Sequence, residues 1–178
     1  MLFSNRLKIR RFNSGDWKRL HEIILDKEAS PYAIYDHEFP TDEKAAKELT
    51  IYFMNSKDFY AICIKSTGEL IGYIALNYCN EHQRNLGYCL HSAHQGKGYA
   101  SEACRTLLEH AFNHLNIEEV IAGTANENHP SCKLLLSLNF KKISESTHSF
   151  RKSSDGTPIE FTGGEYLLKK QDFKNTTS

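Results

Sequence analysis

The chain has 178 residues, with 22 Lys and Arg against 22 Asp and Glu, and its formal net charge is +0. This length suits a single domain. The balanced charge lacks the basic excess typical of nucleic-acid-binding proteins, so we expect no nucleic-acid partner. No apolar run approaches the roughly 20 residues that span a bilayer, so we expect no membrane association either.

Five cysteines are scattered through the chain, at positions 63, 79, 89, 104 and 132. Their number is odd and no pair has metal-ligand spacing, so neither a disulfide framework nor a metal site is predicted. Because disulfides persist mainly in oxidising compartments, this cysteine usage indicates the cytoplasm. The N-terminal sequence has no apolar core of signal-peptide length, which agrees with that location.

The first third of the chain alternates between strand and helix patterns. Residues 6–12 alternate apolar and polar side chains and are predicted to form a strand. Ser14 is a favourable N-cap residue for a helix over 17–25, where apolar side chains recur at helical spacing. An irregular, aromatic-rich stretch follows at 30–40, and Thr41 is expected to cap a second helix.

Three strand patterns then follow in close succession. Residues 58–65 and 70–78 are separated by a Ser-Thr-Gly-Glu turn, and a polar turn at 80–84 leads to a third strand at 86–91. Because such short connections join antiparallel neighbours, we expect an antiparallel meander.

The second half begins with the most regular helix pattern of the chain, an apolar stripe over 100–115. A buried strand is predicted at 120–124, and a short helix at 128–138. Two closing strands, at 140–144 and 159–168, flank an Asp-Gly turn.

These elements follow the order β-αα-βββ-α-β-α-ββ, which predicts an α+β fold with a mostly antiparallel central sheet flanked by helices. We expect a single domain over 1–170 and a polar C-terminal tail over 171–178. Asn139 follows the short helix, and asparagine is the second choice after glycine for the left-handed residue that ends a helix.

The segment Gln95–Ala100 precedes the long helix and contains two glycines. Glycines let a ligand approach the backbone, and a helix start offers unpaired N–H groups and the positive end of the helix dipole. Together they predict a phosphate-binding site. A nucleoside-triphosphatase loop is excluded, because His91 and Gly98 stand where that motif needs Gly and Ser or Thr. A dinucleotide loop is disfavoured, because Ser101 replaces its third glycine.

Four motifs in one order resemble the GNAT N-acetyltransferases, in particular their RimJ/RimL-like branch. They are an opening over 6–17, a central strand over 86–91, a Gln-x-x-Gly-x-Ala loop with its helix over 95–103, and an Asn-x-x-Ser helix with a closing signature over 126–140. The resemblance covers nearly the whole chain. It implies the GNAT fold and acetyl-CoA as the co-substrate.

The resemblance also implies how acetyl-CoA would bind. Its pyrophosphate would lie on the backbone amides of the glycine loop, where Lys97 either adds positive charge or is an ordinary surface lysine. Its pantetheine arm would run beside the central strand, where the N–H of Leu90 would face the thioester oxygen and stabilise the developing oxyanion. The implied cofactor-binding set is Cys89, Leu90, His91, Gln95, Gly96, Lys97, Gly98, Tyr99, Ala100, Asn128 and Ser131.

Asn128 and Ser131 each have two interpretations. The resemblance implies that Asn128 bonds the amide groups of the cofactor and that Ser131 protonates the leaving thiolate. Ser131 and Leu90 are therefore the implied catalytic residues. Local structure alone offers Asn128 as a plain helix N-cap and Ser131 as a polar residue of the first turn.

The acceptor side is implied to consist of residues 31–40 and 157–166. Tyr32, Tyr35 and Glu38 are candidate contacts, although aromatic side chains in these segments also suit a core. The implied reaction is direct attack of an amine on the thioester, without a covalent enzyme intermediate. Deprotonating a lysine-like amine of pKa ~10.4 at pH 7 costs ~4.6 kcal/mol, so a base matters for such an acceptor.

The general base is left open by a departure from the family pattern. Asn85 stands two residues before the central-strand glycine, where the branch usually carries glutamate. Asparagine can orient a water but cannot take a proton, so Asn85 remains only a candidate acceptor contact. Other candidates for the base are His37, Glu38, His82, His91 and His94.

Two functions follow from the sequence. The first is an acetyl-CoA-dependent N-acetyltransferase whose acceptor is a protein N-terminus or a small amine. The second is an acyl-CoA-binding module with little or no activity, for which Asn85 gives a motive. For either function the resemblance implies a monomer or a homodimer.

Overall fold

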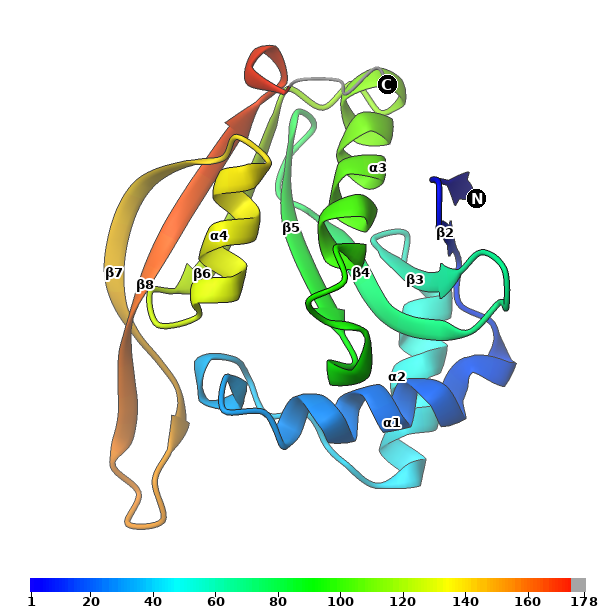
Figure 1. Cartoon of the computed structure of the whole chain (residues 1–178). Coiled ribbons are helices and arrows are strands. Elements are labelled where there is room, and N and C mark those ends of the chain that lie inside the picture. The colour runs from blue at the N-terminus through cyan, green and yellow to red at the C-terminus, as the bar shows by residue number, and fades with distance from the viewer. Residues whose placement is uncertain (174–178) are drawn as a thin grey trace.

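An eight-stranded sheet runs through the molecule (Figure 1), and the computed structural model describes residues 1–173. The strand order is β1-β2-β3-β4-β5-β6-β8-β7, and only the β5–β6 pair is parallel. The predicted α+β fold with a mostly antiparallel sheet is confirmed. The strands are β1 (Leu2–Phe3), β2 (Leu7–Arg10), β3 (Phe59–Ile64), β4 (Leu70–Tyr78), β5 (Gln83–Leu90), β6 (Glu119–Ala125), β7 (Lys141–Lys152) and β8 (Pro158–Lys169).

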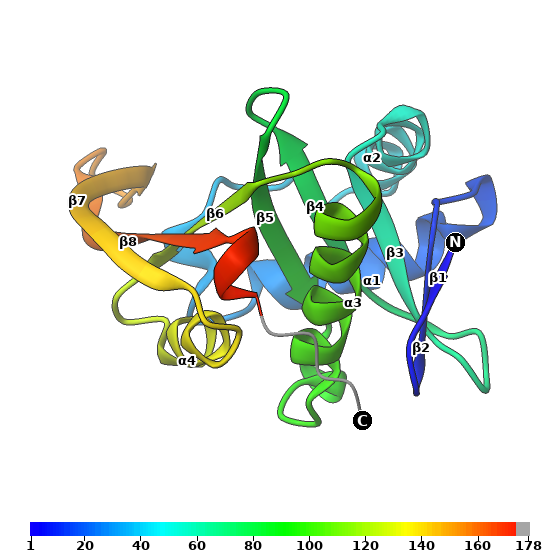
Figure 2. The same ribbon diagram turned by 90° about the horizontal axis from the view of Figure 1, so that it is seen from above.

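In the described part of the chain, four α-helices cover the two faces of the sheet (Figure 2). Helices α3 and α4 enclose a core that includes Leu107 and Leu135, whereas α1 and α2 enclose a second core around Phe53. No helix within residues 1–173 is both long and apolar enough to cross a membrane. The helices are α1 (Trp17–Glu28), α2 (Glu43–Asn55), α3 (Tyr99–His114) and α4 (His129–Ser137), with short 3-10 turns η1 (Ser14–Asp16), η2 (Ala33–Tyr35), η3 (Ser92–His94) and η4 (Lys170–Asp172).

The β5–β6 pair splits part-way along its length. The parallel pairing runs from Gln83 opposite Glu119 to Asn85 opposite Ile121 and then stops, while β6 goes on pairing with β8 as far as Ala125. The second half of β5 therefore has a neighbour on its β4 side and a gap on its β6 side. This gap is the feature of the fold that positions the site.

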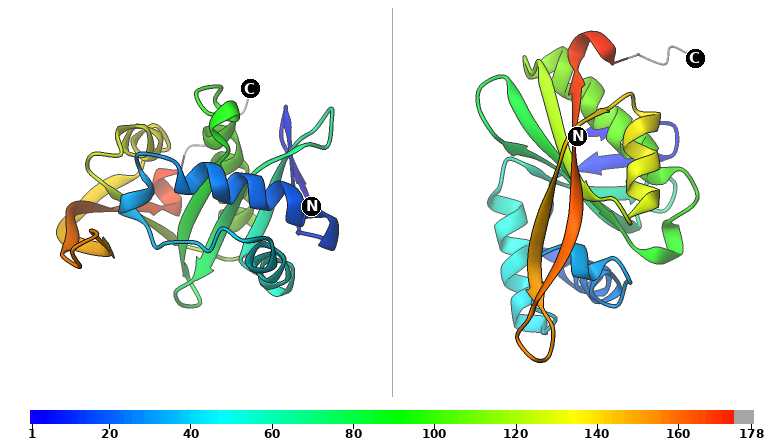
Figure 3. Two further views of the ribbon diagram at one scale, coloured as in Figure 1. Left: turned by 90° about the horizontal axis from the view of Figure 1, so that it is seen from below. Right: turned by 90° about the vertical axis from the view of Figure 1, so that its left-hand side faces the viewer.

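The closing hairpin is longer than the sequence predicts. Strand β7 extends to Lys152 rather than ending at Ser144, and all but one of its residues are exposed. An exposed edge strand carries no apolar alternation, so its second half leaves no periodic signal. Figure 3 shows this β7–β8 ribbon reaching well past the rest of the sheet.

Helix termini correct two capping predictions and agree with a third. Asn13, rather than Ser14, caps the first turn by accepting the N–H of Gly15. Asp42, rather than Thr41, caps α2. Asn139 adopts a left-handed φ of 68° after α4, as expected.

The chain beyond β8 is polar, but its first residues are placed. Residues 170–172 form η4, and Phe173 packs on the Phe112 ring with centroids 5.2 Å apart. The rest of the predicted tail, residues 174–178, lies outside the described residues.

Candidate active site

A cavity of about 1390 Å³ lies at the gap between β5 and β6. Its walls come from the end of α1, the loop after it, strands β4 to β8, the glycine loop and α4. Most of the residues implied by the sequence line this one cavity, but Glu38, His91 and Lys97 do not. The implied residues that line it are Tyr32, Tyr35, Asn85, Cys89, Leu90, Gln95, Gly96, Gly98, Tyr99, Ala100, Asn128 and Ser131.

The glycine loop opens α3 in the manner expected of an anion site. Gly96 and Gly98 have φ of 71° and 81°, a backbone region that side chains with a Cβ rarely adopt. A Cβ at Gly96 would meet no atom within 4 Å, so the space above that glycine is open. Gly98 is the N-cap of α3, and no side chain caps the helix. The first N–H groups of α3 therefore remain available to a phosphate.

The N-terminal segment holds this loop in place. The Arg6 guanidinium donates from Nε to Glu102 at 2.7 Å and from Nη1 to the Lys97 carbonyl oxygen at 3.0 Å, and it lies 4.5 Å above the Tyr99 ring. Partial burial opposes the charge of Glu102, yet hydrogen bonds from Ser4 and Arg6 hold its pKa below the usual value. The loop is thus anchored by the ion pair between Arg6 of the N-terminal segment and Glu102 in the first turn of α3.

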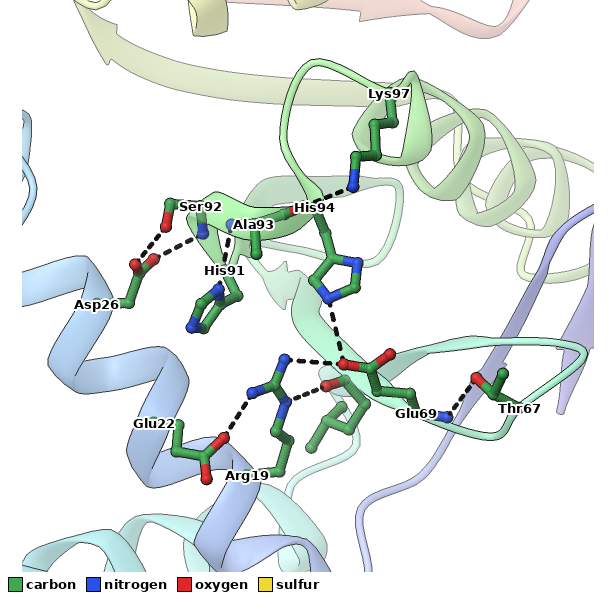
Figure 4. Close-up of polar contacts among 11 residues, drawn as sticks. Arg19, Glu22, Asp26, Thr67, Glu69, His91, Ser92, Ala93, His94 and Lys97 are labelled. Atoms are coloured by element: carbon green, nitrogen blue, oxygen red, sulfur yellow. Dashed lines mark hydrogen bonds and ion pairs between the residues drawn. The ribbon is translucent and has the colours of Figure 1, made fainter.

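A second set of contacts fastens the start of the loop (Figure 4). Asp26 on α1 accepts the backbone N–H of Ser92 at 2.7 Å, and it also accepts the Ser92 hydroxyl. Lys97 donates to the Ala93 carbonyl oxygen at 2.8 Å, so its ammonium group folds back on the loop. His91 accepts the Ala93 N–H at Nδ1, 3.2 Å away.

Leu90 presents its backbone to the gap. It lies opposite Gly72, and the next residue donates from His91 N to the Ile71 carbonyl oxygen at 2.9 Å. That pattern makes Gly72 and Leu90 a non-hydrogen-bonded pair, so the Leu90 N–H and C=O point away from β4. The Leu90 carbonyl accepts the Gln95 side-chain amide at 2.8 Å, which leaves the N–H directed into the gap.

Ser131 and Tyr88 form a hydroxyl pair across the gap. Ser131 is in the first turn of α4, Tyr88 is on β5, and their oxygens are 2.7 Å apart. Burial raises the pKa of Tyr88, so the phenol stays protonated at neutral pH. The pair can therefore donate a proton into the cavity.

Asn128 performs the local role that the sequence allowed. Its Oδ1 accepts the Ser131 N–H at 3.3 Å, which caps α4. Asn128 also lines the cavity, so the residue that caps α4 is part of the cavity wall as well.

One wall of the cavity is the sheet face that carries Asn85. In the strand register, Asn85 on β5 lies opposite Ile121 on β6. Two residues further along β6, Gly123 lies opposite Glu165 on β8, so Gly123 stands between Glu165 and the gap. Ser144 lies next to Glu165 on β7 and donates to its Oε2 at 3.1 Å.

Aromatic rings close the far end of the cavity. Tyr35 meets the Phe161 ring edge-on at 5.2 Å, and Phe150 lies 5.5 Å from Phe161. Arg151 then ties the hairpin to the loop after α1: it donates to the Asp36 carbonyl oxygen at 2.8 Å and pairs with Glu28 at 2.8 Å. This wall joins two segments more than a hundred residues apart.

The histidines proposed from the sequence as bases are dispersed. His82 lies in the exposed turn before β5, and His37 packs on Phe150 with ring centroids 4.4 Å apart. His94 lines the cavity, but its Nε2 lies 3.2 Å from Glu69 Oε1, within a network that includes Arg19 (Figure 4).

Cys89 lies on the same face of β5 as Asn85 and lines the cavity, but it is a poor nucleophile. Burial raises the pKa of its thiol to about 12, so the reactive thiolate is scarce at neutral pH. The cavity thus favours attack by an incoming substrate over formation of an acyl-cysteine.

Comparison with known proteins identifies this architecture. The family model described as "Acetyltransferase (GNAT) domain" matches residues 6–141. The chain belongs to the GNAT acetyltransferases. It is 32% identical over 149 residues to the uncharacterized N-acetyltransferase p20 of Bacillus licheniformis, which covers 79% of this chain and 82% of that protein.

Solved structures show the same fold in more distant proteins. The ribosomal-protein-S5-alanine acetyltransferase of Vibrio fischeri has a TM-score of 0.78 at 18% identity, covering 98% of this chain and 100% of that one. The spermidine N-acetyltransferase of Vibrio cholerae, solved with CoA and spermine, has a TM-score of 0.79 at 17% identity, covering 97% and 100%.

This GNAT acetyltransferase has a site that suits the acetyl-CoA used by its family. The open backbone at Gly96 and the uncapped start of α3 fit a pyrophosphate, and the gap beside Leu90 fits an extended thioester arm. Among residues 1–173 no group of His, Cys, Asp or Glu is arranged to hold a metal.

Four residues of the site were missed in the sequence: Arg6, Tyr88, Arg151 and Glu165. Tyr88 adjoins the central-strand glycine, and Glu165 is one of two acids in the last strand and follows two glycines, so each left a signal. Arg6 and Arg151 act through contacts with residues about 90 and 115 positions away, which no local pattern reveals.

Proposed function

We propose that this chain transfers the acetyl group of acetyl-CoA to a primary amine by direct attack of the amine on the thioester. One observation carries the proposal: a single cavity contains the uncapped start of α3, the gap-facing N–H of Leu90 and the hydroxyl of Ser131. These are an anion site, an oxyanion donor and a proton donor, the three groups that acyl transfer from a thioester needs.

Each protein group has a defined task in this proposal. The amides from Gln95 to Ala100 hold the pyrophosphate, and Asn128 and the edge of β5 from Cys89 to His91 hold the pantetheine arm. The Leu90 N–H donates to the thioester oxygen as negative charge develops there. Ser131, backed by Tyr88, gives a proton to the leaving thiolate.

Direct attack agrees with the chemistry of the cavity wall. The thiol of Cys89 is held protonated by burial, and the Ser131 hydroxyl is bonded to another hydroxyl rather than to a base. Neither side chain is activated as a nucleophile. The amine of the acceptor is then the group that attacks the thioester.

The acceptor is proposed to be a protein N-terminus or a small amine, as in the RimJ/RimL-like branch. The names of two structural relatives, a ribosomal-protein-S5-alanine acetyltransferase and a spermidine N-acetyltransferase, support keeping both kinds of acceptor in this proposal. In this chain Tyr32 and Tyr35 line the acceptor side, and Asn85 lies at the start of the gap. Glu38 is exposed outside the cavity wall and would contact only a long acceptor.

Two further properties belong to this proposal. A monomer or a homodimer is the expected assembly, and the cytoplasm is the expected location. The five cysteines are all free in the structure, which suits a reducing compartment.

The test offers acetyl-CoA with a panel of amines and N-terminal peptides and measures release of free CoA. We expect release with at least one acceptor, and we expect acetyl-CoA to raise the melting temperature. Stabilisation by acetyl-CoA without release from any acceptor would favour a CoA-binding module instead. Gly98→Trp places a large side chain beside Arg6 in the loop and is expected to abolish CoA binding while the chain stays folded.

A further inference from the structure

We propose that Glu165 is the carboxylate that receives the acceptor ammonium and takes its proton, at the site where Asn85 cannot. This inference rests on the proposed acetyl transfer and names the acceptor class: a cationic primary alkylamine with an apolar or aromatic body. Glu165 is an exposed residue of β8 that lines the cavity.

Strand register places Glu165 on the same sheet face as Asn85. Asn85 lies opposite Ile121, and Gly123, two residues further along β6, lies opposite Glu165. Alternate residues of a strand share a face, so Asn85, Gly123 and Glu165 point to the same side. The carboxylate stands two strand spacings, about 10 Å, from the line of β5, and it is level with the opened part of the gap.

The path from Glu165 to the gap carries no side chain. Gly123 lies between them, and a Cβ there would meet no atom within 4 Å. Gly87 on the facing side of the gap is nearly as open, with its closest neighbour, Asn77 Nδ2, at 4.0 Å. These two glycines leave a corridor across this face of the sheet, and we infer that the acceptor amine enters through it.

Glu165 also makes fewer polar contacts within residues 1–173 than the other acids of the cavity wall. Asp36 pairs with Lys27 at 3.0 Å, and Asp26 accepts two hydrogen bonds from Ser92. Within residues 1–173, by contrast, the hydroxyl of Ser144 is the one hydrogen-bond donor seen on Glu165, and no cation lies within ion-pairing distance. Its charge is therefore available to an incoming ammonium group.

His148 is the nearest rival for the same role. Its Nε2 is already bonded to Ser146 Oγ at 2.8 Å, and its ring covers Gly163 and packs on Phe161. The imidazole thus belongs to the aromatic wall rather than to the corridor. Three lysines of the neighbouring strands are paired with other acids: Lys142 with Glu145, Lys141 with Asp172 and Lys169 with Glu119.

The proton and bond changes balance with this assignment. The alkylammonium gives one proton to the Glu165 carboxylate, directly or through one water, and the free amine forms a C–N bond with the thioester carbon. The C–S bond then breaks, the thiolate takes a proton from the Ser131 hydroxyl, and the amide nitrogen loses its second proton to solvent. Ser131 regains a proton from solvent through its hydroxyl partner Tyr88, so the whole reaction releases one proton. Glu165 afterwards releases its proton to solvent.

The aromatic wall determines the rest of the acceptor. Tyr35, Phe150 and Phe161 lie beyond Glu165 at the closed end of the cavity. An amine held at Glu165 would extend its body towards these rings, which favours an apolar or aromatic substituent.

The test compares Glu165→Gln with a matched control, Glu160→Gln, on the other face of the same strand. The probes are 2-phenylethylamine and a peptide with a free N-terminal alanine. We expect Glu165→Gln to lower kcat/KM for 2-phenylethylamine about 100-fold at pH 7, a typical loss for a general base. The loss is expected to shrink as the pH approaches ~10.4, where alkylamines deprotonate unaided. The peptide, whose α-amine has a pKa of ~7.8, should lose less.

Calorimetric binding of 2-phenylethylamine to the CoA-loaded protein separates this inference from the proposed function. Weaker binding in Glu165→Gln, with no acetylation even by the unaltered chain, would refute the transfer reaction but support amine recognition. Equal binding and turnover in Glu165→Gln and Glu160→Gln would overturn the inference, as would a loss of turnover that is constant with pH. A chain that neither binds nor acetylates this amine would overturn it as well.

Discussion

Replacing Gly72 by alanine would displace the backbone that the proposal makes the oxyanion donor. Gly72 on β4 lies opposite Leu90, and a Cβ there would stand 2.2 Å from the Cys89 carbonyl oxygen and 3.0 Å from Leu90 Cα. Since ordinary Cβ contacts begin near 3.4 Å, the two strands would have to part by about 1 Å. The Leu90 N–H would move with its strand.

Two effects of different size follow from that displacement. Overpacking a tight strand pair costs ~1–3 kcal/mol, and each kcal/mol lowers the Tm of a chain of this size by ~2–4 °C. Misplacing a catalytic group by ~1 Å costs up to ~100-fold in rate. We therefore expect Gly72→Ala to melt several degrees lower and to lose ten- to 100-fold in kcat at 25 °C, where it is still folded.

The assay combines thermal melting, calorimetric binding of CoA, and kcat for the best acceptor. Gly123→Ala is the control for stability, because its Cβ enters open space and its φ is not in the left-handed region. That variant is expected to melt at or slightly above the temperature of the unaltered chain. A Gly72→Ala protein with lowered Tm but unchanged kcat would refute the role of the Leu90 N–H, and one unchanged in both would refute the reasoning on packing.

Three further results are expected. Gly123→Ala should raise the KM for amines several-fold while leaving CoA affinity unchanged, because its methyl group enters the corridor; steady-state kinetics checks this, and an unaltered KM would contradict it. Ser131→Ala should lower kcat about ten- to 100-fold with CoA binding retained, whereas a role as a cap neighbour alone would change only Tm. Partial burial opposes the charge of Glu28, but hydrogen bonds from Arg151 and its neighbours lower its pKa below 4.5. Its stabilisation is therefore present above about pH 4.5 and is lost as the pH falls through the folded-state pKa, so the Tm gap between the unaltered chain and Glu28→Gln should close in acid.

The parts of the fold that sequence reasoning found are those where one face of an element is buried. Helix α3 and the strands of the meander each bury one face, so their apolar residues recur at a regular spacing in the sequence. Strand β7 shows the converse. Residues 145–152 pair only with β8 and, apart from Arg151, are exposed, so they carry no regular apolar alternation that could mark them as strand.

The site divides in the same way. The glycine loop could be predicted because a phosphate needs local features, two glycines and a helix start within six residues. The placement of Glu165 and Gly123 on the same sheet face as Asn85 could not be predicted, because these residues are brought together only by strand pairing. Gly72 has the same difficulty: nothing near it in the sequence shows that Leu90 lies against it.

The two tethers of the cavity have a consequence for how such a protein diverges. Arg6, near the N-terminus, holds the glycine loop, and Arg151, near the C-terminus, holds the aromatic end of the cavity. Among the described residues, no side chain contacts both Arg6 and Arg151. Substitutions in the hairpin can therefore alter which molecule is modified without retuning the part that holds the donor. Relatives of this chain can therefore evolve towards new acceptors while they keep the same acetyl donor.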